Sequence, residues 1–115
     1  MNIKFGERYY DEWLGEVYSI LSDGEEIGAV DYIEEGDEVY VRVLSIAYHL
    51  RDFKLFEGAV DILKSMFPGK KLTGLAGPIG CYCGDPEYWK ALGATTYPDP
   101  DDDIFTVFEL EIKEA

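Results

Sequence analysis

The chain has 115 residues and a mass of 13.0 kDa; 47% of its residues are hydrophobic, and its formal net charge is −14 at pH 7. This length supports one modest hydrophobic core, so we expect a single domain over residues 1–115. The ten Lys and Arg residues are scattered along the chain. That scatter, with the negative charge, excludes a nucleic-acid-binding surface, because contact with phosphates requires clustered cations.

The N-terminal sequence, MNIKFGERYYDEW, has no apolar run of signal-peptide length. No segment approaches the roughly 18 apolar residues that a membrane span needs. We therefore expect a soluble, cytoplasmic protein. The aromatic side chains of Phe5, Tyr9, Tyr10 and Trp13 either cover the sheet or leave an exposed apolar patch, which would favour a homodimer or a protein partner.

Three antiparallel strands are predicted between Gly15 and Tyr48. Apolar runs rich in Val, Ile and Tyr are separated there by SDGEE and EEGDE. Each break holds a glycine with acidic neighbours, a pattern typical of tight turns. The third run has apolar residues on both faces, which predicts a central strand covered on both sides.

An amphipathic helix is predicted from Leu55 to Phe67, where apolar residues recur at helical spacing. Asp52 is placed to cap its start, and the sequence PGKK ends it. A short strand and a loop follow in KLTGLAGPIG.

A second, short helix is predicted in DPEYWKALGA, with Asp85 as N-cap, Pro86 at the first helical position and Gly93 at the C-terminal end. The sequence TTYPDPDDDIFTVFELEI then predicts two strands around an acidic loop. This loop lacks the glycine and the distal glutamate of an EF-hand. Together the elements predict an α+β fold with a mixed, mainly antiparallel sheet and two helices.

The order of these elements, together with YWKALGA before the last strands, resembles the GNAT N-acetyltransferase superfamily. The resemblance covers Gly15 to Ile112, without the family's first strand and its two N-terminal helices. It implies an acyl-CoA N-acyltransferase-like fold, with acetyl-CoA as cofactor and a small amine or a protein amine as acceptor.

In that family, backbone amides of an Arg/Gln-x-x-Gly-x-Gly/Ala loop hold the cofactor's pyrophosphate at a helix N-terminus. Arg51 falls on the first position of this pattern, Lys54 on the first glycine and Phe56 on the second small residue. The resemblance therefore places the cofactor site over the end of the third strand and the start of the helix, at Ile46, Ala47, Arg51, Asp52, Phe53, Lys54, Leu55 and Phe56.

The family's later motif resembles Phe-Tyr-x-x-Leu-Gly-Phe, whose tyrosine often protonates the departing thiolate. Trp89 stands in the place of this tyrosine, and an indole N–H is too weak an acid for that role. The adjacent Tyr88 is the candidate acid, and a carboxylate such as Glu38 or Asp31 is the candidate acceptor for the proton of the amine.

The residues leave several functions open. Arg51 and Lys54 could replace the missing glycine amides with side-chain charge, so that acyl-CoA binds in an altered pose. Alternatively the cofactor site is lost, and the chain is an acidic interaction or inhibitor protein that occupies a basic surface of a partner, as nucleic-acid mimics do. A third reading is a module that works only within a complex.

We predict no metal site. Zinc requires four ligands, whereas the chain has one histidine, His49, and the two cysteines Cys81 and Cys83, which are only two positions apart. The simplest role for both thiols is that of small buried groups, and a reactive thiol in the glycine-rich loop is the alternative. The lone His49 has no acidic neighbour closer than Asp52 to orient it.

Overall fold

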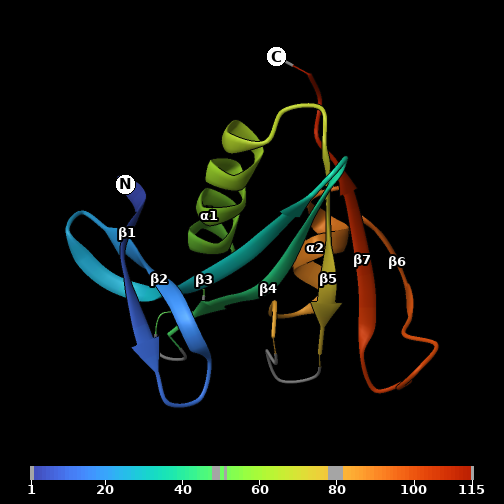
Figure 1. Ribbon diagram of the computed structural model, residues 1–115, viewed down its shortest axis with the longest axis horizontal. Helices are drawn as coiled ribbons and strands as arrows, with labels where there is room; N and C mark the ends of the chain where they lie inside the picture. The colour runs from blue at the N-terminus through green and yellow to red at the C-terminus, as the bar shows by residue number, and fades with distance from the viewer. Residues whose placement is uncertain (1, 48–49, 51, 78–81, 115) are drawn as a thin grey trace.

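The apolar runs after Gly15 fold as the three predicted antiparallel strands, within a larger sheet (Figure 1). The computed structural model describes residues 2–47, 50, 52–77 and 82–114. Its helices are α1 (Phe53–Met66) and α2 (Pro86–Ala91). Its strands are β1 (Ile3–Asp11), β2 (Gly15–Ser22), β3 (Glu25–Glu35), β4 (Glu38–Ile46), β5 (Lys71–Ala76), β6 (Thr95–Pro98) and β7 (Thr106–Glu111).

The strands form one sheet in the order β1-β2-β3-β4-β5-β7-β6. Among the described strands only the β4–β5 pair is parallel, because α1 carries the chain back between these two strands. This arrangement confirms the predicted α+β class, with a mixed, mainly antiparallel sheet and two helices. The described helices include none long and apolar enough to cross a bilayer.

The N-terminal segment forms an edge strand that the sequence analysis did not predict. β1 pairs antiparallel with β2, with an irregularity between Phe5 and Arg8. The expectation that the chain has no strand before Gly15 is therefore wrong. Phe5 is half-buried and packs near Tyr32, with ring centroids 6.4 Å apart, whereas Trp13 in the following turn is 91% exposed.

The central position of β4 is confirmed, since it is the fourth of seven strands. The prediction that both faces of β4 are covered is confirmed only in part. Val39, Val41 and Val43 are buried, but Tyr40 is 39% exposed.

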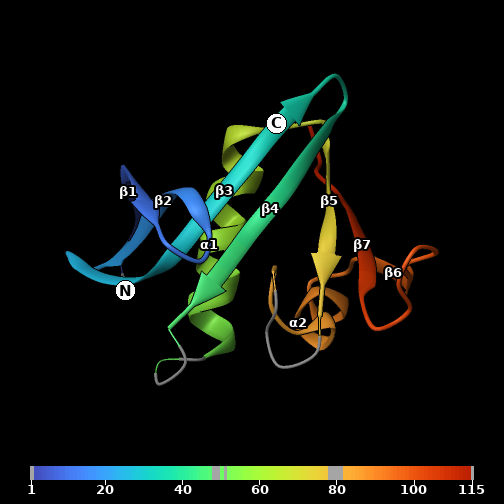
Figure 2. The ribbon, with the colours of Figure 1, turned by 60° about the horizontal axis from the view of Figure 1, so that its bottom comes forward.

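Helix α1 has the predicted cap, because the side chain of Asp52 accepts a hydrogen bond from the backbone N–H of Lys54 at 2.7 Å. The helix begins at Phe53, two residues before the predicted Leu55. Its apolar face, Phe56, Ala59, Val60 and Leu63, is buried against the sheet. Figure 2 shows α1 lying along β3 and β4.

Helix α2 has the predicted N-terminal cap, with Asp85 accepting from the N–H of Glu87 and Pro86 in the first turn. Its C-terminal cap is Leu92, one residue before the predicted Gly93. Its anchor is Trp89, which is fully buried and stacks on Phe108 of β7 at a centroid distance of 3.7 Å. Trp89 also meets Phe56 of α1 edge to face. Both helices therefore pack on the same face of the sheet.

Candidate functional site

Strands β4 and β5 pair over only part of their length. The parallel pairing runs from Glu38 beside Lys71 to Val41 beside Gly74. Beyond this point the two strands diverge, as Figures 1 and 2 show. The opening between them lies next to the start of α1 and of α2, where the resemblance places the cofactor.

A β-bulge in β4 accounts for the divergence. Asp31 and Tyr32 are successive residues of β3, but their partners Val43 and Val41 are two positions apart, so Arg42 is an extra residue. Such a residue bends its strand and increases the local twist. Gly74 lies where the two strands begin to diverge. Glycine is required there, because a Cβ would lie 2.6 Å from the carbonyl oxygen of Val41.

The chain fills this opening with its own segment Tyr82–Gly84, which we call the plug. The N–H of Leu44 in β4 donates to the carbonyl of Tyr82 at 3.2 Å, and the N–H of Cys83 donates to the carbonyl of Leu75 in β5 at 3.1 Å. The N–H of Gly77 donates to the carbonyl of Gly84 at 3.3 Å. The plug thus occupies backbone groups that a ligand between the two strands would use.

Side-chain contacts hold the plug in place. Trp89 donates its indole N–H to the carbonyl of Cys83 at 2.8 Å, and the thiol of Cys83 donates to the carbonyl of Val41 at 3.1 Å. Cys83 is fully buried, and this burial raises its pKa far above the ordinary value of a thiol. The prediction of a buried structural thiol is thus confirmed for Cys83, while Cys81 lies outside the described residues.

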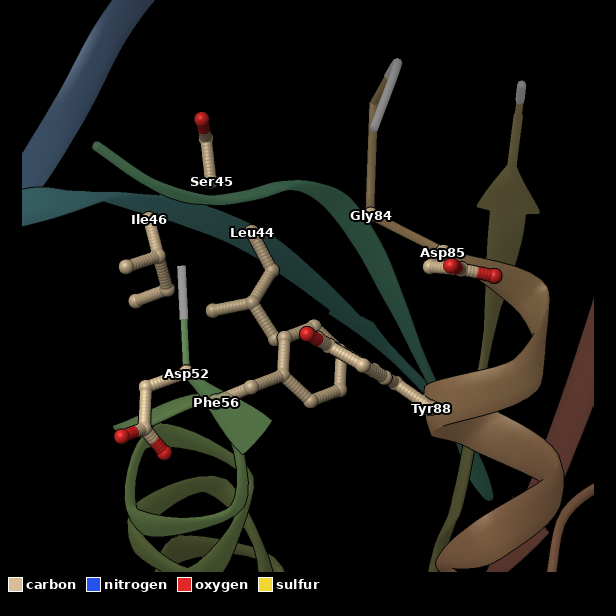
Figure 3. Close-up of a pocket in the computed structure, with 8 residues that line it drawn as sticks. All are labelled: Leu44, Ser45, Ile46, Asp52, Phe56, Gly84, Asp85 and Tyr88. Carbon is tan, nitrogen blue, oxygen red and sulfur yellow. The ribbon is translucent and has the colours of Figure 1, made fainter. Parts of the chain in front are cut away.

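A small pocket of about 80 Å³ remains beside the plug (Figure 3). In Figure 3 the hydroxyl of Tyr88 points across the ring of Phe56, and the carboxylates of Asp52 and Asp85 stand on opposite sides of the pocket. Its lining consists of Leu44, Ser45, Ile46, Asp52, Phe56, Gly84, Asp85 and Tyr88.

The pocket includes several residues that the sequence analysis assigned to the cofactor site or to catalysis, namely Ile46, Asp52, Phe56 and Tyr88. The analysis missed Leu44, Ser45, Gly84 and Asp85. For Asp85 the capping pattern was a signal, because it marked the start of a helix beside the predicted site. No sequence pattern indicated that Gly84 would lie between two strands.

Of the other predicted cofactor residues, Ala47, Phe53, Lys54 and Leu55 do not line this pocket. Phe53 packs edge to face on Tyr88 with a centroid distance of 5.3 Å. The N–H of Ala47 donates to the carbonyl of Ile27 at 2.7 Å, Leu55 packs against the core, and Lys54 is exposed. Arg51 and His49 lie outside the described residues.

The structure does not bring the two predicted catalytic residues together. Glu38 is the first residue of β4, at the end of the strand opposite to the pocket, and its carboxylate lies 4.0 Å from the ammonium of Lys71. Asp31, the other suggested proton acceptor, is buried, and its two oxygens accept hydrogen bonds from Arg8 at 3.1 Å and Arg42 at 2.6 Å.

Three features of the described residues oppose the binding of acetyl-CoA at this site. The carboxylate of Asp52 takes the place at the N-terminus of α1 where an anion would accept the backbone hydrogen bonds, and it would repel a diphosphate. The plug fills the opening between β4 and β5. The pocket volume of about 80 Å³ compares with roughly 300–1,000 Å³ for typical small-molecule sites. Within the described part of the chain, no three His, Cys, Asp or Glu side chains gather to hold a metal ion.

Comparison with known proteins gives a likeness of structure. No protein-family model matches the sequence, and no curated protein matches it. Among solved structures, the chain is similar to the ribosomal-protein-S18-alanine N-acetyltransferase from Escherichia coli, with a TM-score of 0.58 and 15% sequence identity over 86% of this chain and 70% of that one. The chain therefore has the fold of the GNAT N-acetyltransferases.

Proposed function

We propose that this chain acts by binding a basic protein partner and does not transfer acyl groups. The observation that carries the proposal is the internal pairing of the cleft: the plug occupies the strand opening, and Asp52 caps α1. The net charge of −14 supports a partner of opposite sign, because charge complementarity accelerates encounter and suppresses wrong partners.

Acetyl-CoA-dependent transfer to a small amine or a protein amine is the competing function. The fold likeness favours it, and Tyr88 in the pocket is its candidate acid. A fold alone does not imply an activity, because the same scaffold can carry unrelated sites. The two functions differ in their ligand and can be separated by binding measurements.

Calorimetric titration and thermal unfolding with acetyl-CoA and with CoA test the proposal. We expect no heat of binding and no shift in Tm up to about 1 mM ligand, whereas saturation at 100 times Kd would stabilise the fold by about 2.7 kcal/mol. Lys54→Glu serves as the matched variant, because Lys54 is exposed beside the helix start. A stabilisation shared by both ligands and lost in Lys54→Glu would overturn the proposal.

A second arm tests the basic partner with a defined probe, a fluorescein-labelled deca-arginine peptide. We expect binding at about 50 mM salt that weakens steeply by about 300 mM, because salt screens interactions between exposed charges. Absence of binding at low salt, or binding unchanged at high salt, would contradict the proposed charge recognition.

A further inference from the structure

One face of the sheet, across β3, β4, β5 and β7, is covered by neither of the two described helices. Residues that pair directly across neighbouring strands point to the same side of a sheet. The pairing places Ile33, Tyr40, Thr73 and Glu109 in one row across β3, β4, β5 and β7. Both described helices pack on the opposite side, since Trp89 and Phe56 contact each other over the core.

A second row of this face consists of charged residues. Glu35, Glu38, Lys71 and Glu111 pair in register across the same four strands. Lys71 is shared, with its ammonium 4.0 Å from Glu38 and 3.5 Å from Glu109. The two rows, which we call the open face, therefore carry four carboxylates and one ammonium group.

Apolar surface lies beside these carboxylates. Ile33 is 46% exposed and Tyr40 is 39% exposed, although both lie within strands. A hollow of about 320 Å³ is lined by Glu35, Glu38, Tyr40 and Thr73. A tyrosine ring next to two carboxylates suits a guanidinium or ammonium group, which gains both charge attraction and a contact with the ring.

We propose that the open face is the docking surface for the basic partner, and that the hollow receives one Arg or Lys side chain of that partner. This inference rests on the proposed function and adds the location and the chemistry of the contact. Charge complementarity selects the occupant: a second copy of a chain with a net charge of −14 would place like charges opposite each other, whereas a segment rich in Arg or Lys would pair with Glu35 and Glu38.

Two double variants that remove the same amount of charge distinguish the contribution of the open face to binding from that of the overall charge. Glu35→Gln with Glu38→Gln changes the open face, while Glu57→Gln with Asp61→Asn removes the same charge from α1 on the other side of the sheet. Binding of labelled deca-arginine is measured by fluorescence anisotropy at about 50 mM salt. We expect the open-face pair to weaken binding by about tenfold and the α1 pair by less than about twofold.

The outcomes distinguish the inference from the proposed function. Equal weakening by the two double variants would show attraction by overall charge alone; the inference would fail, and the proposed function would stand. No binding by the wild-type protein would overturn both. A dimer that is lost in the variant Tyr40→Ala, detected by analytical ultracentrifugation, would assign the open face to a second copy and would also overturn the inference.

The variant Tyr40→Ala tests the hollow without changing any charge. We expect it to weaken deca-arginine binding several-fold, because the ring contact is lost, and its Tm is measured alongside to confirm that it folds. Amide chemical shifts of the wild-type protein, recorded during the titration, should move at Ile33, Tyr40 and Thr73 and stay fixed along α1. The reverse pattern would contradict the location.

Discussion

Among single residues, Asp31 is the one whose surroundings differ most from its expected use. The sequence analysis offers it as a proton acceptor near a reacting amine. In the structure it is only 6% exposed, and it lies between the guanidinium groups of Arg8 and Arg42. Arg42, the bulged residue of β4, also donates to the carbonyls of Leu14 and Glu16. Asp31 therefore helps to fix the β1–β2 hairpin against the bulge.

Replacing Asp31 should destabilise the protein. We expect Asp31→Ala to lower the free energy of unfolding by about 2–4 kcal/mol, because it removes the buried carboxylate that pairs with both Arg8 and Arg42. Urea unfolding followed by circular dichroism measures this loss. The exposed Asp61→Ala serves as control and should change the free energy by less than about 0.5 kcal/mol. Equal stability of the two variants would contradict the structural role of Asp31.

The carboxyl group of Glu109 on the open face should have a lowered pKa. The hydroxyl of Tyr97 donates to its carboxylate at 2.7 Å, and this bond, with a smaller contribution from Lys71, lowers the pKa of Glu109 below its ordinary value of 4.5. Because the folded pKa is the lower one, the stabilisation is fully present above pH 4.5 and is lost as pH falls through the folded pKa. In Tyr97→Phe we expect the pKa of Glu109 to rise toward 4.5, as measured by NMR titration of its carboxyl carbon. An unchanged pKa would show that the hydrogen bond is not the cause.

Among the elements, the plug should protect the thiol of Cys83 from chemical modification. Only the thiolate reacts with iodoacetamide, and burial both shields Cys83 and raises its pKa. We expect Cys83 to stay unmodified in the native protein at pH 8 and to react on unfolding, as read by peptide mass spectrometry. Trp89→Phe removes the indole donor to the Cys83 carbonyl and should speed the reaction. Rapid modification of Cys83 in the native wild-type protein would mean that the plug opens freely.

The elements differ in how far the sequence could predict them. The turns after β2 and β3 and the caps Asp52 and Asp85 depend on neighbouring residues, and all were predicted. The strand β1 was missed because Gly6 and the irregularity before Arg8 interrupt its alternation. The bulge at Arg42 and the plug depend on pairing between distant segments, which a local pattern does not encode. Ile46, Asp52 and Phe56 of the pocket were assigned from the family resemblance, whereas nothing in the sequence indicated Gly84.

For the whole molecule, the sequence gives the amount of charge but not its distribution. The value of −14 follows from counting residues, whereas the open face exists only because β4, β5 and β7 bring Glu38, Lys71 and Glu111 into one row. The predicted fold also did not contain the order β5-β7-β6. In this order the two helices cover one side, and the other side of these strands carries Tyr40 and its acidic neighbours.

The position of β7 has a consequence for how the chain is made. β6 pairs only with β7, and β7 also separates it from β5. During translation β6 therefore emerges before the strand that it needs, and β5 remains an edge strand until the same moment. A nascent chain that stops before Thr106 would expose one free edge of β5 and the unpaired β6, which are templates for association with other chains. Synthesis of Thr106–Glu111 thus completes two strand interfaces in one step.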